Sequence, residues 1–213
     1  MHIDFLFYLP EILSVTVIAI FMSISPGADF VMVTKNSLFQ NRKAGIYSAV
    51  GISLAIWIHV AYSIAGLAVV ISNSVLLFSF IKYLGAAYLI YIGWKSFQAN
   101  TALDLTKKNN RKPLSNLAAF KMGIITNALN PKTTLFFLSI FTQVVNPDTP
   151  LLLQLLYGAI ISLAHLIWFC MVAVFITHPS WLGLFNRYKN KIEKGVGLLL
   201  IGFGLKVAFS SNG

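Results

Sequence analysis

The sequence has few acidic residues and a single cysteine. Only six of the 213 residues are Asp or Glu, and 10% of the chain is charged, whereas a soluble domain usually has about 25% charged residues. Charges this sparse are too few to cover a surface that faces water. Cys170 stands alone, which excludes a disulfide framework and a site built from several thiolate ligands.

Hydrophobic residues, by contrast, make up 57% of the chain and form long runs. A helix that spans a membrane needs about 20 mostly apolar residues. Six segments meet this requirement, at roughly 10–34, 44–71, 78–98, 115–144, 151–177 and 192–210. They leave no room for a sizeable catalytic domain outside the membrane. We therefore predict an all-α integral membrane protein in which residues 1–213 form one transmembrane domain of six helices.

The positive charges favour one orientation of these six spans. Of the sixteen Lys and Arg residues, thirteen fall on one face of the membrane, only Lys82 and Lys206 on the other, and Lys132 inside a span. Short basic loops stay in the cytoplasm, so both termini are predicted to be periplasmic. The net charge of +10 does not indicate nucleic acid, because a nucleic-acid binder spreads its basic residues over a polar face.

A polar segment at 99–113 divides the chain nearly in half. The halves, about 1–100 and 113–213, carry three spans each, so a repeated unit would insert with opposite orientation. Equivalent features follow in the same order in both: Pro10 and Pro113, Ile52-Ser53-Leu54-Ala55 and Ile161-Ser162-Leu163-Ala164, then Ile90, Gly93 and Lys95 and Ile201, Gly204 and Lys206. We predict two inverted three-helix repeats, an architecture of secondary transporters, which bind substrate at the repeat interface.

The first span of each half contains a proline, at Pro26-Gly27 and at Pro131. Proline inside a helix removes a backbone hydrogen bond and clashes with the preceding turn, so both first helices are predicted to be broken. Backbone groups freed at membrane depth must be satisfied by protein or trapped water. Breaks at matching positions in both halves indicate a binding site.

A charged residue follows each break, Asp29 in the first half and Lys132 in the second. A charge deep in a span costs about 2.5–3.5 kcal/mol on insertion scales and tends to face a cavity or a partner. Asp29 has an alternative role as the N-cap of the helix that follows, and Lys132 has one as a side chain that snorkels to the interface. We favour a functional pair that meets where the two breaks meet.

Four further polar residues lie in the spans. Asn127 and Asn130 flank the second break, where they are suited equally to capping and to binding substrate. His59 and His165 are suited to proton relay or to hydrogen-bonded helix packing. No HExxH motif, carboxylate cluster or second cysteine accompanies them, so we expect neither a metal nor another cofactor.

Three stretches resemble the LysE/RhtB family of amino-acid exporters. The first signature is matched by Ser25-Pro26-Gly27-Ala28-Asp29-Phe30, then Arg42-Lys43-Ala44-Gly45 and Gly51. The second is matched by Phe120-Lys121-Met122-Gly123, Asn127 and Asn130-Pro131-Lys132, and the end of the third helix by Tyr88 to Trp94. The resemblance covers essentially the whole chain. One departure is Ala28, where the family commonly has the second proline of Pro-Gly-Pro-Asp.

The resemblance implies export of small amino acids or their derivatives, such as threonine, homoserine or homoserine lactone, across a bacterial inner membrane by proton antiport. The residues expected to bind substrate are Pro26, Gly27, Asp29, Asn127, Asn130, Pro131 and Lys132, and Asp29 is also expected to couple transport to protons. Basic substrates are disfavoured, because the charges at membrane depth are predicted to be one acid and one base.

Two other classes of function stay open at this point. A passive channel would have both breaks lining a pore, and a membrane enzyme or redox protein would be built around His59 and His165. The matched breaks and the lack of a set of metal ligands favour the transporter over both. The expected partners are the amino-acid substrate, protons, membrane lipid and, as one option, a second copy of the chain.

Overall fold

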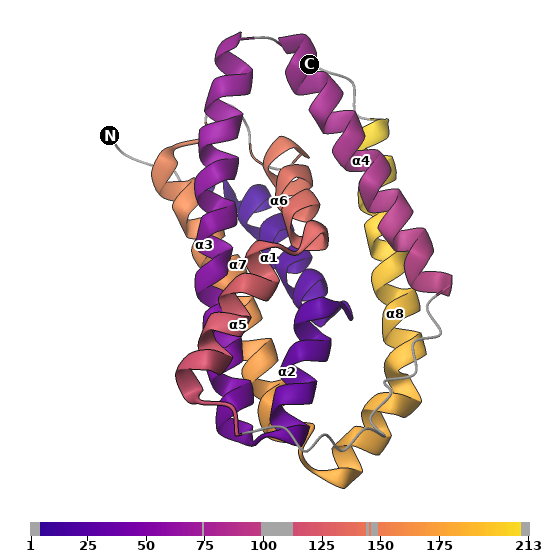
Figure 1. Ribbon diagram of the computed structural model, residues 1–213. Coiled ribbons are helices and arrows are strands. Elements are labelled where there is room, and N and C mark those ends of the chain that lie inside the picture. The colour runs from indigo at the N-terminus through magenta and orange to yellow at the C-terminus, as the bar shows by residue number, and fades with distance from the viewer. Residues whose placement is uncertain (1–4, 74, 99–112, 144, 146–148, 210–213) are drawn as a thin grey trace.

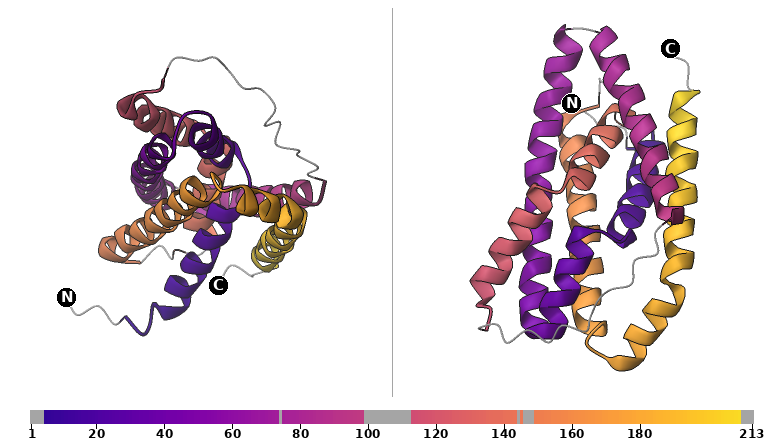
Figure 2. Two further views of the ribbon diagram at one scale, coloured as in Figure 1. Left: turned by 90° about the horizontal axis from the view of Figure 1, so that it is seen from below. Right: turned by 45° about the vertical axis from the view of Figure 1, so that its right-hand side comes forward.

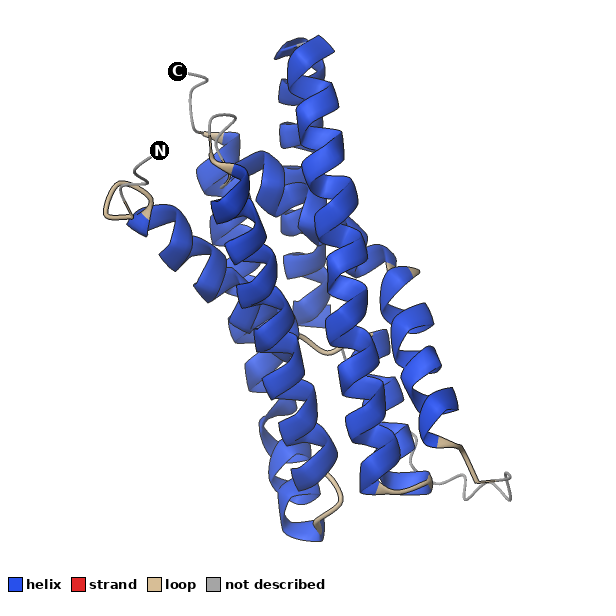
Figure 3. Cartoon of the chain, turned by 90° about the vertical axis from the view of Figure 1, so that its left-hand side faces the viewer, coloured by secondary structure: helices blue, strands red, loops and turns tan. Residues whose placement is uncertain are grey.

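The structure is a computed structural model that describes residues 5–73, 75–98, 113–143, 145 and 149–209. Over these residues the chain forms helices joined by short connections and no strand (Figure 3). The helices are α1 Leu9–Ile24, α2 Ala28–Phe39, α3 Arg42–Asn73, α4 Val75–Gln98, α5 Asn116–Ala128, α6 Pro131–Gln143, α7 Leu151–Phe175 and α8 Pro179–Ala208 (Figure 1). The predicted linker lies, except for Pro113, outside the described residues.

The helices identify a helical membrane protein. Two segments, Arg42–Gly66 of α3 and Leu151–Phe175, are each long and apolar enough to cross a membrane. The pair α1 and α2 meets the same test as one broken span that bends by 52°. Each of the six segments predicted from the sequence overlaps a helix or a pair of consecutive helices.

The last helix is longer than the span predicted within it. That span is predicted to begin near residue 192, and α8 begins at Pro179. Proline fits the first position of a helix, where its missing N–H costs nothing. Residues 179–191 include three basic side chains, which exclude them from an apolar span but do not prevent them from forming a helix.

Helices α3 and α7 lie side by side in the bundle, with α5 packed on α3 and α1 packed on α7. Helices α4 and α8 pack along each other at one edge (Figure 2). The main core cluster joins α1, α3, α6 and α7 with residues of α4 and α8, and a second cluster joins α2, α3 and α7. The ends of α2 and α7 and the starts of α3, α5 and α8 lie at the lower end of the bundle in Figure 1.

The contact between α3 and α7 is reciprocal. The Ser53 hydroxyl donates to the Ser162 carbonyl oxygen at 3.1 Å, and the Ser162 hydroxyl donates to the Ser53 carbonyl oxygen at 2.9 Å. The two hydroxyl oxygens are 2.8 Å apart. Ser53 and Ser162 are equivalent in the predicted repeat, and each of them donates to the carbonyl group of the other.

The contact between α4 and α8 is reciprocal in the same way. A Cβ atom added at Gly93 would lie 2.6 Å from the Gly197 carbonyl oxygen, and one added at Gly204 would lie 2.8 Å from the Ala86 carbonyl oxygen. Gly93 and Gly204 are equivalent in the predicted repeat, and Ala86 and Gly197 are separated by the same offset. The missing side chains let the two helices approach closely.

Candidate functional site

The first helix break lies between α1 and α2. Helix α1 ends at Ile24, α2 begins at Ala28, and Gly27 is the N-cap residue with an extended backbone. Asp29 is the second residue of α2. The alternative role of Asp29 as the N-cap is therefore wrong, and its carboxyl group lies in the first turn, where the helix dipole favours negative charge.

The second break lies between α5 and α6. Helix α5 ends at Ala128 and α6 begins at Pro131. The Asn130 side-chain oxygen accepts a hydrogen bond from the Lys132 backbone N–H at 3.0 Å. Its backbone oxygen accepts from the Thr134 backbone N–H at 3.0 Å. Asn130 therefore caps α6, the structural role that the sequence left open for it.

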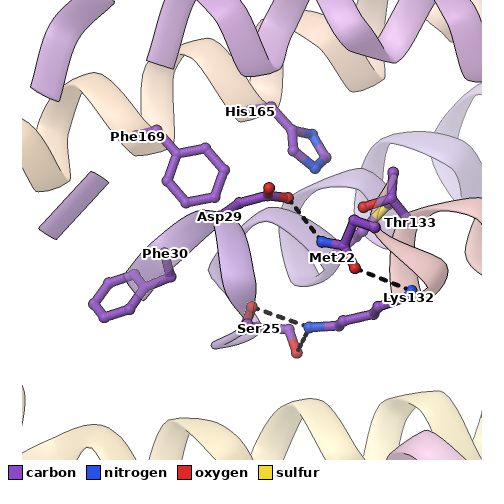
Figure 4. A pocket seen from close by; sticks show the side chains of 10 residues that line it. Met22, Ser25, Asp29, Phe30, Lys132, Thr133, His165 and Phe169 are labelled. Carbon is purple, nitrogen blue, oxygen red and sulfur yellow. Dashed lines mark hydrogen bonds between the residues drawn. The ribbon is translucent and has the colours of Figure 1, made fainter. Parts of the chain in front are cut away.

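The Lys132 side chain reaches from the second break to the first. Its ammonium group donates to the Ser25 hydroxyl at 2.6 Å and to the Ser25 carbonyl oxygen at 3.1 Å (Figure 4). It also donates to the Pro26 carbonyl oxygen at 3.2 Å. These carbonyl groups lie just past the C-terminus of α1, where the helix dipole favours a cation. The ammonium thus satisfies the backbone groups that the first break leaves free.

The Asp29 side chain is held by groups of the second break. Its Oδ2 atom accepts from the Asn127 side-chain nitrogen at 2.9 Å and from the Asn130 side-chain nitrogen at 3.1 Å. The side chain is only 6% exposed, and its Oδ1 atom has no hydrogen-bond partner among the described residues. Each break therefore carries one charged side chain that is bound by polar groups of the other break.

Asp29 and Lys132 line one small cavity. The two helix breaks therefore meet, as predicted from the sequence. The cavity measures about 10 Å³, and Ser25, Gly27 and Asn130 also line it. This is about the space of a single water molecule. Binding of a larger solute therefore requires the surrounding helices to move apart.

Three of the predicted site residues, Pro26, Asn127 and Pro131, do not line this cavity. Pro131 is exposed at the start of α6. Asn127 is fully buried behind Asp29, and its backbone oxygen is 3.1 Å from His59 Nε2. Pro26 contributes its carbonyl oxygen to Lys132. The predicted site residues thus line the cavity or contact a residue that lines it, except for Pro131, which begins helix α6.

The two histidines differ in position. The His59 Nδ1 atom is 2.6 Å from the Tyr62 hydroxyl, and its ring stacks on Phe137. Through its Nε2 atom, His59 contacts the Asn127 carbonyl oxygen. His165 lines the cavity with Asp29 (Figure 4), and its Nδ1 atom is 2.8 Å from the Ile161 carbonyl oxygen. No group of three or more His, Cys, Asp or Glu residues in the described part of the chain is arranged to hold a metal ion.

Sequence reasoning missed several residues of this region. Ser25, Phe30, Thr133 and Phe169 line the cavity. Glu193 on α8 is also buried, with only 3% of its surface exposed. The expectation of one buried acid and one buried base was therefore incomplete. Ser25 directly precedes the proline of the first break. This position next to the break is the feature of the sequence that could have identified Ser25 as a site residue.

A helical membrane protein with paired helix breaks and opposite charges at one buried site has the architecture of a membrane transport protein. The model of the LysE type translocator family matches residues 20–211, and the chain belongs to this family. The match confirms the resemblance seen in the two signatures.

Relatives match over most of their length. The uncharacterized membrane protein YrhP of Bacillus subtilis is 35% identical over 203 residues, which cover 91% of this chain and 96% of that protein. The leucine efflux protein of Salmonella typhimurium is 31% identical over 198 residues, 89% of this chain and 91% of that protein. The membrane protein YahN of Escherichia coli is 26% identical over 185 residues, which cover 87% and 83%. No solved structure matches the chain.

Proposed function

We propose that the protein is a secondary active exporter of amino acids that works by proton antiport. The observation that carries this proposal is the crossed arrangement of Asp29 and Lys132, each bound by the helix break of the other half. An acid and a base at one buried site match the two charges of an amino-acid zwitterion. The relatives named leucine efflux protein support an amino acid as the cargo.

In this proposal the chain is one transmembrane domain of six spans, arranged as two inverted three-helix repeats. The reciprocal contacts of Ser53 with Ser162 and of α4 with α8 support it, because a two-fold relation between the halves produces contacts of this kind. The basic end of the bundle would face the cytoplasm of a bacterial inner membrane. Both termini would then be periplasmic.

The proposed binding mode assigns one charge of the substrate to each break. The substrate ammonium group binds the Asp29 carboxylate and the carbonyl oxygens of Ser25 and Pro26. The substrate carboxylate binds Lys132 and the N–H groups at the start of a half-helix. In the closed site the Lys132 ammonium occupies the carbonyl oxygens itself. A substrate carboxylate that draws Lys132 away would free them for the substrate ammonium.

Asp29 is also the proposed proton-coupling residue. When its carboxylate is ionised, it attracts the substrate ammonium, and when it is protonated, that attraction is lost. Protonation from the outer side would therefore release the substrate there, and loss of the proton to the cytoplasm would restore the empty site. One proton enters for each substrate that leaves in this scheme.

The proposed substrates are neutral amino acids. Threonine and homoserine follow from the family resemblance, and leucine follows from the name of a relative. Basic amino acids would add a second cation near Lys132, which is unfavourable unless a further acid compensates for it. Glu193 is a further buried acid that would suit this role, so labelled lysine is tested in the same vesicles as the neutral amino acids named below.

The test is transport in vesicles that contain the purified protein. An acidic lumen should drive accumulation of labelled threonine, homoserine or leucine as protons leave in exchange, and an ionophore that removes the pH gradient should abolish it. The variant Asp29→Asn should lose this accumulation. Glu11→Gln is the matched control, because Glu11 is an acid of α1 that accepts a hydrogen bond from Tyr157 at 2.9 Å and lies outside the site.

The result also separates the rival functions. Accumulation that survives in Asp29→Asn would rule out the coupling role of Asp29. Equilibration of substrate without accumulation, independent of the gradient, would identify a channel. If none of the amino acids moves, the proposed cargo is wrong.

A further inference from the structure

A second, larger cavity lies beside the charged site. It measures about 230 Å³, is partly open to the outside of the bundle and is lined by side chains of α2, α7 and α8. Its wall is apolar and aromatic and includes Phe30, Trp168, Val172, Ile176, Tyr188 and Ile192. Several wall residues on α7 and α8 are partly exposed, whereas Phe30, Val172 and Ile176 are buried and form the inner wall.

Phe30 separates the two cavities. Its side chain is 1% exposed and lines both the polar cavity and the apolar one. It directly follows Asp29 on α2 (Figure 4). Once the helices have moved apart to admit a solute at Asp29 and Lys132, displacement of the Phe30 ring would let that solute extend into the apolar space.

The apolar cavity marks the place where two equivalent helix pairs of the predicted repeat differ. In one pair, α4 packs against α6, and the Ser139 hydroxyl of α6 donates to the Gly85 carbonyl oxygen of α4 at 3.1 Å. In the other pair, α8 and α2, the described residues face each other across the cavity instead of packing closely. The cavity thus lies beside the second of these two pairs.

The size and chemistry of the cavity indicate what fits it. An apolar cavity of about 150 Å³ is large enough to bind benzene, so about 230 Å³ has room for a branched aliphatic or an aromatic side chain. A hydroxyl group placed there would lose its hydrogen bonds to water without gaining others, which is unfavourable. The polar cavity of about 10 Å³ has no room for such a side chain.

Building on the exporter function proposed above, we infer that this apolar cavity receives the side chain of the transported amino acid. The ammonium and carboxylate groups bind at Asp29 and Lys132, and the side chain extends past Phe30 between α7 and α8. The protein then prefers amino acids with a large apolar side chain, such as leucine, methionine and phenylalanine, over threonine, homoserine and alanine. Phe30 is the residue that sets this preference.

The test compares substrates of different size in the same vesicles. Met171 lines the cavity and is 46% exposed, so Met171→Trp should fill the cavity without disturbing the buried core. One methylene in a hydrophobic pocket changes specificity by about 10–200-fold. We therefore expect kcat/KM for leucine to fall at least tenfold in Met171→Trp, while kcat/KM for alanine stays within twofold. Ile167→Trp is the matched control, one turn away on α7, 52% exposed and outside the cavity wall.

A second variant changes Phe30, the residue between the two cavities. Phe30→Leu removes part of the ring between the two cavities, and we expect it to raise kcat/KM for phenylalanine relative to alanine. Equal effects of Met171→Trp on leucine and alanine, or a wild-type protein that transports threonine and alanine better than leucine, would overturn the inference and leave the exporter function standing. If the wild type transports no amino acid at all, the exporter proposal itself fails.

Discussion

The ammonium group of Lys132, which follows the helix break of the second half, lies 2.6 Å from the hydroxyl group of Ser25, which precedes the break of the first half. The same ammonium is 3.1 Å from the Ser25 carbonyl oxygen. This contact ties the two breaks together at the point where the backbone of α1 has lost its helical partners. Together with the hydrogen bonds from Asn127 and Asn130 to Asp29, it accounts for how two interrupted helices and two charges persist inside a membrane protein.

Removal of the Lys132 charge should damage both stability and transport. In Lys132→Gln the carbonyl oxygens of Ser25 and Pro26 lose a charged donor, at a cost of about 1–3 kcal/mol for each acceptor left unsatisfied. We expect a lower unfolding temperature in detergent and loss of proton-driven accumulation. Lys121→Gln serves as the control, because Lys121 is exposed on α5. Full transport by Lys132→Gln would contradict a role of the ammonium group in binding substrate.

Asn127 should matter through Asp29 rather than through the substrate. It is fully buried and donates a 2.9 Å hydrogen bond to the Asp29 carboxylate. A hydrogen bond to a charged group contributes about 1.5–3 kcal/mol, so Asn127→Ala should lower kcat/KM by about ten- to a hundredfold. Asn116→Ala is the control, because Asn116 is exposed at the start of α5.

The pH dependence of Asn127→Ala distinguishes this positioning role from a general loss of structure. If Asn127 acts on the Asp29 carboxylate, the pH profile of transport should move relative to the wild type. A fall in rate that is equal at every pH would instead indicate damaged packing.

The helix breaks and the charged residues beside them followed from the sequence, because their causes are local. Proline interrupts a helix wherever it falls inside one, and a charge among apolar residues is visible without a structure. The crossed bonding was not predictable, because the partners of Lys132 and Asp29 are about 100 residues away along the chain. Phe30 was missed because one phenylalanine in an apolar run looks like ordinary core, and only the two cavities beside it distinguish it.

The crossing of α3 and α5 should tolerate no side chain at its closest point. A Cβ atom added at Gly51 would lie 2.2 Å from the Phe120 carbonyl oxygen, and one added at Gly123 would lie equally close to the Ser48 carbonyl oxygen. Backbone atoms cannot move aside as a flexible side chain does, so Gly51→Ala should destabilise the protein by about 1–3 kcal/mol.

The matched control for Gly51→Ala is on the same helix. Gly66 has no atom within 4 Å of an added Cβ, so Gly66→Ala should be neutral or stabilising by up to about 1 kcal/mol. Thermal unfolding in detergent measures both variants. Equal unfolding temperatures for the two would contradict the close helix crossing.

The reciprocal serine contact leads to a test of the two-fold relation between the halves. Ser53→Ala and Ser162→Ala each remove one hydroxyl that donates to the carbonyl group of the other helix. Hydrogen bonds between helices in a membrane contribute about 0.6 kcal/mol on average, so each variant should lose about that much. If this contact is two-fold symmetric, the two losses of stability should be equal.

The double variant Ser53→Ala/Ser162→Ala should lose an amount that differs from the sum of the two single losses, because the hydroxyl groups are 2.8 Å apart and interact directly. Ser14→Ala is the control, because the Ser14 hydroxyl donates within its own helix, to the Pro10 carbonyl oxygen at 2.7 Å. Reversible unfolding of all four variants gives these free energies, and clearly unequal losses for Ser53→Ala and Ser162→Ala would count against the two-fold relation.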